Sequence, residues 1–169
     1  MLAVFDIDGT LVDSRATILS ATRTAARAMG LPEPDYEVVR GGGGLSLTEA
    51  MARLAPDLEP EEVDRYTDHY KAAFVAMHVE PGFEEPLYAG AMDLLADLKR
   101  RGWRLSLATG QSRRGVARNL ARAGWADLFL SSHCAEDGPG KPDPAMLHAA
   151  IAACSARGDQ TIMIGDTGH

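Results

Sequence analysis

The 169-residue sequence has few cysteines, few aromatic residues and no long apolar run. Its two cysteines, Cys134 and Cys154, suit neither a disulfide framework nor a metal-binding pair, so we expect a reduced, cytoplasmic protein. The longest apolar runs, such as residues 72–77, span six residues and cannot cross a membrane. The N-terminus reaches Asp6 after five residues, which is too short and too acidic for a signal peptide.

Positive charge is also scarce. Seventeen lysines and arginines stand against 24 aspartates and glutamates, which gives a net charge of −7. A nucleic-acid-binding surface usually carries a basic excess, so we expect no nucleic-acid partner. Arg114, Arg118 and Arg122 recur on one predicted helical face, and the acidic balance favours a solvated face there.

Both ends of the chain alternate apolar strands with amphipathic helices. This order predicts an α/β protein with a doubly wound (Rossmann-like) parallel sheet, whose chemistry collects at the carboxyl ends of the strands. The predicted strands cover residues 2–6, 104–109, 127–130 and 161–165, and the predicted helices cover 88–101, 112–123 and 144–156.

The middle of the chain is helical throughout. Candidate helices near 15–29, 46–55 and 60–78 are separated by prolines and glycines. We therefore predict a core domain made of residues 1–13 and 84–169, and a small all-helical domain inserted at 14–83.

The first predicted strand ends in Asp6-Ile7-Asp8-Gly9-Thr10. Residues two apart in an extended segment point the same way, so both carboxylates would project into the crevice. One carboxylate can attack while the other handles protons, or both can help to hold a cation. A plain surface turn is the alternative. A calcium loop is excluded, because Leu11 stands where that loop needs Gly.

The later strand ends add an anion cradle, a lysine and a third carboxylate. Thr109-Gly110 offers a hydroxyl and a free amide, Lys141 is one of only three lysines and lies in a stiff proline-rich loop, and Asp166 follows the fourth strand. Each feature has a simpler alternative. Thr109-Gly110 could be an ordinary turn, Lys141 a solvated surface lysine, and Asp166 a helix-capping residue. No nucleotide P-loop is present around Lys141, because Pro142 stands where Ser or Thr is needed.

Taken together, these motifs resemble those of the haloacid-dehalogenase-like phosphohydrolases. The resemblance covers the whole chain, and the helical insert is similar to the cap of the phosphoglycolate-phosphatase-like branch. The matching segments are residues 6–14, Thr109, residues 141–144 and residues 165–167.

The resemblance implies a role for each residue. Asp6 would be the nucleophile that forms an aspartyl-phosphate, and Asp8 the acid and then the base. Thr109 and the Gly110 amide would hold phosphoryl oxygens, while Lys141 would offset their charge and orient Asp6.

The resemblance also implies Mg²⁺, held by Asp6, the Asp8 carbonyl and Asp166. The family has a further acid at position 170, followed by another helix and strand, whereas this sequence stops at His169. We therefore expect a fragment or a truncated protein with an incomplete metal site, weak Mg²⁺ binding and a tendency to associate. His169 itself is not expected to be a ligand.

We thus predict a magnesium-dependent phosphatase of a small, phosphoglycolate-like phosphorylated metabolite, with the oligomeric state left open. The alternatives are an impaired member that binds a phosphorylated ligand or a partner, and a sugar-phosphate mutase. The glycine run 41–44 follows Arg40 and could form a loop that reaches over the substrate. On this interpretation, Arg40 and Gly43 are candidate substrate-binding residues. A simple linker explains that run equally well.

Overall fold

The computed structural model describes residues 1–43 and 45–167. It separates into two compact units, one formed by Met1–Asp13 and Leu87–His169 and the other by Ser14–Pro86. The domain boundary expected from the sequence, between residues 83 and 84, lies three residues before the observed one.

The first unit is built on a four-stranded parallel sheet in the order β3-β2-β1-β4. The predicted α/β fold with a parallel sheet is thereby confirmed. The strands are β1 (Leu2–Phe5), β2 (Arg104–Ala108), β3 (Ser131–His133) and β4 (Thr161–Ile164). The helices of this unit are α5 (Ala91–Arg100), α6 (Arg113–Arg122) and α7 (Ala145–Ala153), with short 3-10 turns η1 (Ala135–Asp137) and η2 (Gly158–Gln160).

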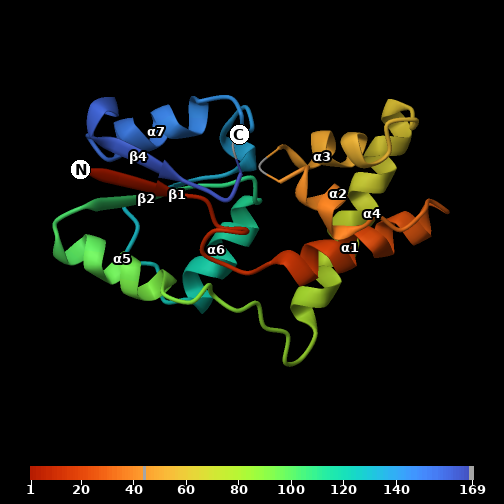
Figure 1. Cartoon of the computed structure of the whole chain (residues 1–169), viewed down its shortest axis with the longest axis horizontal. Helices are drawn as coiled ribbons and strands as arrows, with labels where there is room; N and C mark the ends of the chain where they lie inside the picture. The colour runs from red at the N-terminus through yellow and green to blue at the C-terminus, as the bar shows by residue number, and fades with distance from the viewer. Residues whose placement is uncertain (44, 168–169) are drawn as a thin grey trace. The chain divides into compact units, whose positions relative to one another are not determined.

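Helices cover both faces of this sheet because β1 is apolar on both sides. Ala3 and Phe5 belong to the core cluster that contains Leu95 of α5, whereas Leu2 and Val4 belong to the cluster formed with α7. Side chains alternate between the faces of a strand, so a strand buried on both sides reads as a continuous apolar run. Figure 1 shows α5 and α7 on opposite sides of the strands.

The predicted strand at 127–130 is wrong. These residues form a turn in which the Leu128 N–H donates to the Trp125 carbonyl at 2.9 Å, and Phe129 packs edge-on against Trp125 with ring centroids 5.7 Å apart. Leu128 and Phe129 therefore pack in the core, whereas Leu130 is exposed. The strand follows immediately as the polar segment Ser131–His133, where the Ser131 and Ser106 hydroxyls lie 2.8 Å apart.

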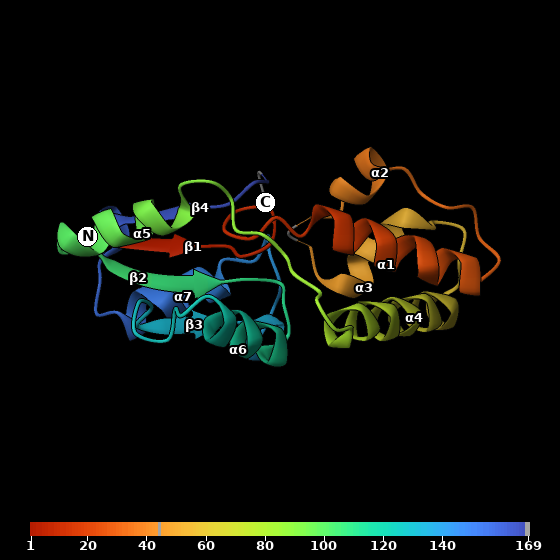
Figure 2. The ribbon, with the colours of Figure 1, turned by 90° about the horizontal axis from the view of Figure 1, so that it is seen from below.

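The second unit is entirely helical in its regular structure. Its helices are α1 (Arg15–Ala28), α2 (Tyr36–Arg40), α3 (Leu47–Leu54) and α4 (Pro60–Val79). All but the five-residue α2 match the predicted helices. Ala25 of α1 and Tyr66 of α4 belong to one buried cluster, and the two helices lie side by side in Figure 2. Ser46 caps α3 by accepting from the Glu49 N–H at 3.3 Å.

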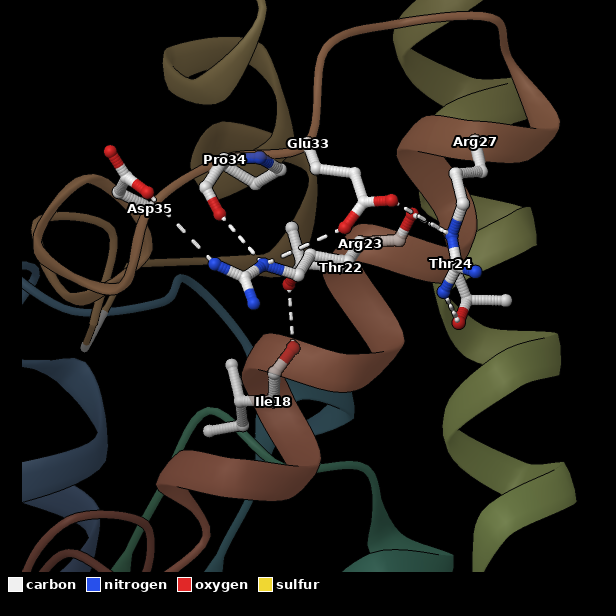
Figure 3. A network of polar contacts seen from close by, with 8 residues as sticks. All are labelled: Ile18, Thr22, Arg23, Thr24, Arg27, Glu33, Pro34 and Asp35. Carbon is white, nitrogen blue, oxygen red and sulfur yellow. Dashed lines mark hydrogen bonds and ion pairs between the residues drawn. The ribbon is translucent and has the colours of Figure 1, made fainter.

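A polar network holds the segment before α2 against α1 (Figure 3). The Arg23 Nε donates to the Pro34 carbonyl at 3.1 Å, and the Arg27 Nε lies 3.3 Å from a Glu33 carboxylate oxygen. Arg23 also approaches Asp35 at 3.9 Å. Because these pairs are solvent-exposed, each stabilises the fold by about 1 kcal/mol or less, and their main effect is to direct the chain into α2.

None of the helices in residues 1–43 and 45–167 is long and apolar enough to cross a membrane.

Candidate active site

The carboxyl ends of β1, β2 and β4 bring three predicted site residues to one edge of the sheet. In the parallel register, Phe5 is paired with both Leu107 and Ile164. The next residue of β1 is Asp6, whose N–H donates to the Ile164 carbonyl at 2.9 Å. Thr109 is the first residue after β2, and Asp166 is the second residue after β4. The parallel pairing of the strands therefore places Asp6, Thr109 and Asp166 at the same edge of the sheet.

Asp6 is buried and held at both carboxylate oxygens. Its residue exposure is 5%, Oδ1 accepts from the Ile7 N–H at 2.7 Å, and Oδ2 forms an ion pair with the Lys141 Nζ at 2.5 Å. Lys141 is 8% exposed and reaches Asp6 from the loop before α7. A buried charge that keeps its ionised form needs such a partner, because desolvation of a lone carboxylate is costly.

The turn after Asp6 depends on a glycine. The Ile7 carbonyl accepts from the N–H groups of Thr10, Leu11 and Val12, and Gly9 has a φ of 74°, a left-handed conformation that favours glycine. A Cβ at Gly9 would lie 2.6 Å from the Asp166 Cγ, so the carboxylate occupies the space that a side chain would need. Asp166 therefore lies directly against the Asp8–Gly9 turn.

The loop after β2 contacts Asp8. The Gln111 Nε2 donates to the Asp8 Oδ2 at 2.8 Å, and the Gln111 main-chain N–H donates to the Thr109 Oγ1 at 3.3 Å. Thr109 is fully buried, its N–H donates to the His133 carbonyl, and the intervening Gly110 is exposed. The sequence reading missed Gln111; its only signal was its place two residues after Thr109.

The acidic turn η1, between β3 and Lys141, is held to the start of α6 by hydrogen bonds and an ion pair with Arg113. Asp137 accepts from the Cys134 N–H at 2.8 Å and pairs with Arg113, while the Arg113 N–H donates to Glu136 at 2.9 Å. The pKa of Asp137 is lowered to about 2. The hydrogen bond from the Cys134 main-chain N–H is the largest cause, and the hydrogen bond from the Arg113 guanidinium is the next. Burial raises the pKa of the Cys134 thiol to about 11, so this thiol stays protonated near neutral pH.

The expected Mg²⁺ ligands are all oxygen atoms, which suits a hard cation. Asp6 and Asp166 follow neighbouring strands, and a Cβ on Gly165 would lie 3.9 Å from the Asp6 Cβ. In the described part of the chain, no three His, Cys, Asp or Glu residues are placed to hold a metal ion. The expected set uses two carboxylates and the main-chain carbonyl of Asp8, and it stays a prediction.

Two candidate substrate-binding residues belong to the helical unit. Arg40, at the end of α2, pairs with Glu37 at 3.7 Å and has a half-exposed side chain. The Gly43 N–H donates to the Arg40 carbonyl at 3.0 Å. Their role in substrate binding stays a prediction, and Gly44 and His169 lie outside the described residues.

Comparison with known proteins identifies relatives along the whole chain. The family model for haloacid dehalogenase-like hydrolases matches residues 1–169. The chain is 35% identical to the "Probable phosphatase IndB" of Dickeya dadantii, with 99% of this chain and 74% of that protein covered. It is 31% identical to a phosphoglycolate phosphatase of Rhodospirillum rubrum, over 97% of this chain and 70% of that enzyme.

A third relative carries a different name. The tyrosine-protein kinase PtkA of Mycobacterium tuberculosis is 29% identical over 99% of this chain, which spans about half (56%) of that protein.

A solved structure shares the fold. A protein from Bacteroides fragilis named a haloacid dehalogenase-like hydrolase superposes with a TM-score of 0.88 at 23% identity, covering 98% of this chain and 78% of that one.

Proposed function

The chain belongs to the haloacid dehalogenase-like hydrolases, and on that premise we propose that it is a magnesium-dependent phosphatase of a small, phosphoglycolate-like metabolite. Relatives named phosphatase and phosphoglycolate phosphatase support this proposal. The observation that carries it is the buried Asp6 carboxylate, oriented by the Ile7 amide and the Lys141 ammonium. Such an oriented carboxylate is a ready nucleophile at the edge where parallel sheets bind ligands.

In the first step, an Asp6 oxygen forms a bond to phosphorus while the bond from phosphorus to the ester oxygen breaks. The leaving oxygen takes a proton from Asp8, so the alcohol departs neutral. Lys141 offsets the negative charge that Asp6 and the phosphoryl group bring together. Each carboxylate oxygen has two lone pairs, so an oxygen that accepts one hydrogen bond can still attack.

In the second step, Asp8 is ionised and takes a proton from a water molecule. The water oxygen bonds to phosphorus, and the bond from phosphorus to Asp6 breaks, which releases inorganic phosphate and regenerates both carboxyl groups. The Thr109 hydroxyl and the Gly110 amide donate to phosphoryl oxygens. The Thr109 Oγ1 accepts from the Gln111 N–H, so its own hydrogen can point toward the substrate.

Mg²⁺ would be held by the Asp6 and Asp166 carboxylates and the Asp8 carbonyl, and when bound it would offset the charge of the phosphoryl oxygens. The helical unit would act as a cap over the substrate, with Arg40 and Gly43 as its contacts. Two buried free thiols, Cys134 and Cys154, fit a reducing, cytoplasmic location.

The test measures inorganic phosphate released from 2-phosphoglycolate and p-nitrophenyl phosphate, with Mg²⁺ or EDTA. We expect Mg²⁺-dependent release that Asp6→Asn abolishes, while Asp68→Asn, at an exposed pair of α4, leaves it unchanged. Ligand binding without release would contradict the proposal and favour an impaired binding protein. Parallel incubations use a sugar phosphate, and ATP with a tyrosine-containing protein. A phosphoryl group retained on the sugar would indicate a mutase, and one transferred to tyrosine would indicate an activity like the one named for PtkA.

A further inference from the structure

We propose that Gln111 is a positioning residue for Asp8, and that Asn119 fixes the direction in which the Gln111 amide donates. The inference rests on the proposed function, because it assigns to Asp8 the transfer of protons. It concerns two neutral side chains that the family motifs identified in the sequence do not include.

The three side chains form one hydrogen-bonded series. The Asn119 Nδ2 donates to the Gln111 Oε1 at 2.9 Å, and the Gln111 Nε2 donates to the Asp8 Oδ2 at 2.8 Å. Asn119 is 1% exposed and lies on the inner face of α6. A buried amide in a helix interior is uncommon, and here both of its polar atoms are used.

The main chain of α6 sets the direction of the series. The Asn119 Nδ2 also donates to the Gly115 carbonyl at 3.2 Å, and the Arg122 guanidinium donates to the Asn119 Oδ1 at 3.4 Å. A main-chain carbonyl can only accept and a guanidinium can only donate, so the Asn119 amide has one allowed orientation. Gln111 must then present its oxygen to Asn119 and its NH₂ group to Asp8.

Gly115 leaves the space in which Gln111 packs. A Cβ at this position would lie 3.0 Å from the Gln111 Oε1 and 3.4 Å from the Gln111 Cβ. Gly115 lies in the first turn of α6, where its N–H donates to the Ser112 Oγ at 3.2 Å, so the cap of α6 fixes the position at which Gln111 approaches. The Gln111 carbonyl also accepts from the Ala135 N–H at 3.0 Å, which anchors the residue at its main chain.

The consequence for catalysis concerns one oxygen of Asp8. The Gln111 NH₂ group occupies one lone pair of Oδ2 and holds that oxygen in place. Gln111 thereby fixes the plane of the carboxyl group through which Asp8 transfers protons. A misplacement of about 1 Å can cost on the order of 100-fold in rate, and proton donation matters most when the leaving group is poor.

The test compares wild type and Gln111→Met on p-nitrophenyl phosphate, which has a good leaving group, and phenyl phosphate, which has a poor one. Methionine keeps the length of the side chain and removes its donor. Because Asp8 also acts in hydrolysis of the intermediate, the rate compared is that of alcohol release in the first turnover. We expect this rate to fall by about 10- to 100-fold on phenyl phosphate and by less than about 3-fold on p-nitrophenyl phosphate. Gln160→Met, at an exposed glutamine of η2, is the matched control.

A second variant covers the case in which Gln111→Met fails to fold. Gly115→Ala should push Gln111 and reproduce the selective loss, whereas Gly158→Ala, where an added Cβ meets nothing within 4 Å, should not. Equal losses on both substrates, or no loss on either, would overturn the inference while the wild type stays active. A wild type that releases no phosphate would instead overturn the proposed function and this inference with it.

Discussion

Replacing Lys141 by methionine should destabilise the protein strongly in the absence of a metal ion. The side chains of Lys141 and Asp6 are 10% and 7% exposed, and their charged atoms lie 2.5 Å apart. Methionine is close to lysine in length, so the packing along the alkyl chain is largely kept. What is lost is the only cation that the structure pairs with Asp6 in the described residues, while Asp166 stays close by.

Breaking a buried ion pair by removing one partner costs about 3–5 kcal/mol, because the other charge is left uncompensated. For a chain of this size, about 2–4 °C of melting temperature corresponds to each kcal/mol. The melting temperature should therefore fall by roughly 6–20 °C. The double variant Asp6→Asn/Lys141→Met removes both charges and should recover most of the lost stability, but not the activity.

The assay is thermal and urea unfolding at neutral pH in EDTA, followed by circular dichroism. Lys71→Met is the matched control, because Lys71 pairs with Asp68 at 3.3 Å with side chains 59% and 77% exposed. That exposed pair should cost less than about 1 kcal/mol. If Lys141→Met lost no more stability than Lys71→Met, the reasoning from the buried pair would be refuted.

Three further predictions concern the pH dependence of stability and the turn after β1. Folded Cys134 has a pKa of about 11 against 9.0 for a free thiol, so between these values the unfolded state binds fewer protons. The free energy of unfolding should fall as pH rises through that window, and less so in Cys134→Ser, as urea titrations at several pH values would reveal. Folded Asp137 has a pKa of about 2 against 3.8, so its stabilisation should be lost as pH falls from about 4 to 2. Asp137→Asn should flatten acid unfolding there. Gly9→Ala should cost more than the roughly 1–2 kcal/mol of its left-handed conformation, because its Cβ meets Asp166. Gly30→Ala, with a φ of 69° and open space, should cost only that conformational part in the same thermal melts.

The sequence predicted the parts of the fold that depend on local pattern. Three of the four strands lie within the predicted ranges, because β1, β2 and β4 are apolar runs between helices. The predicted position of β3 is wrong because its residues, Ser131–His133, are polar, while the preceding Leu128 and Phe129 pack in the core. The five-residue α2 carries too short a pattern to register as a helix.

The candidate site was predictable as far as strand ends determine it. Asp6 and Lys141 are far apart in sequence, and the structure brings them into an ion pair. The role of Lys141 in orienting Asp6, which the family resemblance implies, stays a prediction. Gln111 and Asn119 could not be identified in this way. Their significance depends on the direction of two amides and on the space above Gly115, which only the packed α6 and its loop determine.

The central claim is that Asp6 is the nucleophile and Asp8 the proton-transferring group, and trapping of a phosphorylated enzyme tests it most directly. Wild type, Asp6→Asn and Asp8→Asn are mixed with p-nitrophenyl phosphate and Mg²⁺, quenched in acid and analysed by peptide mass spectrometry. We predict that Asp8→Asn accumulates one phosphoryl group on the peptide containing Asp6, because attack proceeds with a good leaving group but hydrolysis of the intermediate stalls. Asp6→Asn should carry none. A phosphoryl group retained in Asp6→Asn, or absent from Asp8→Asn after a burst of nitrophenol, would contradict the claim.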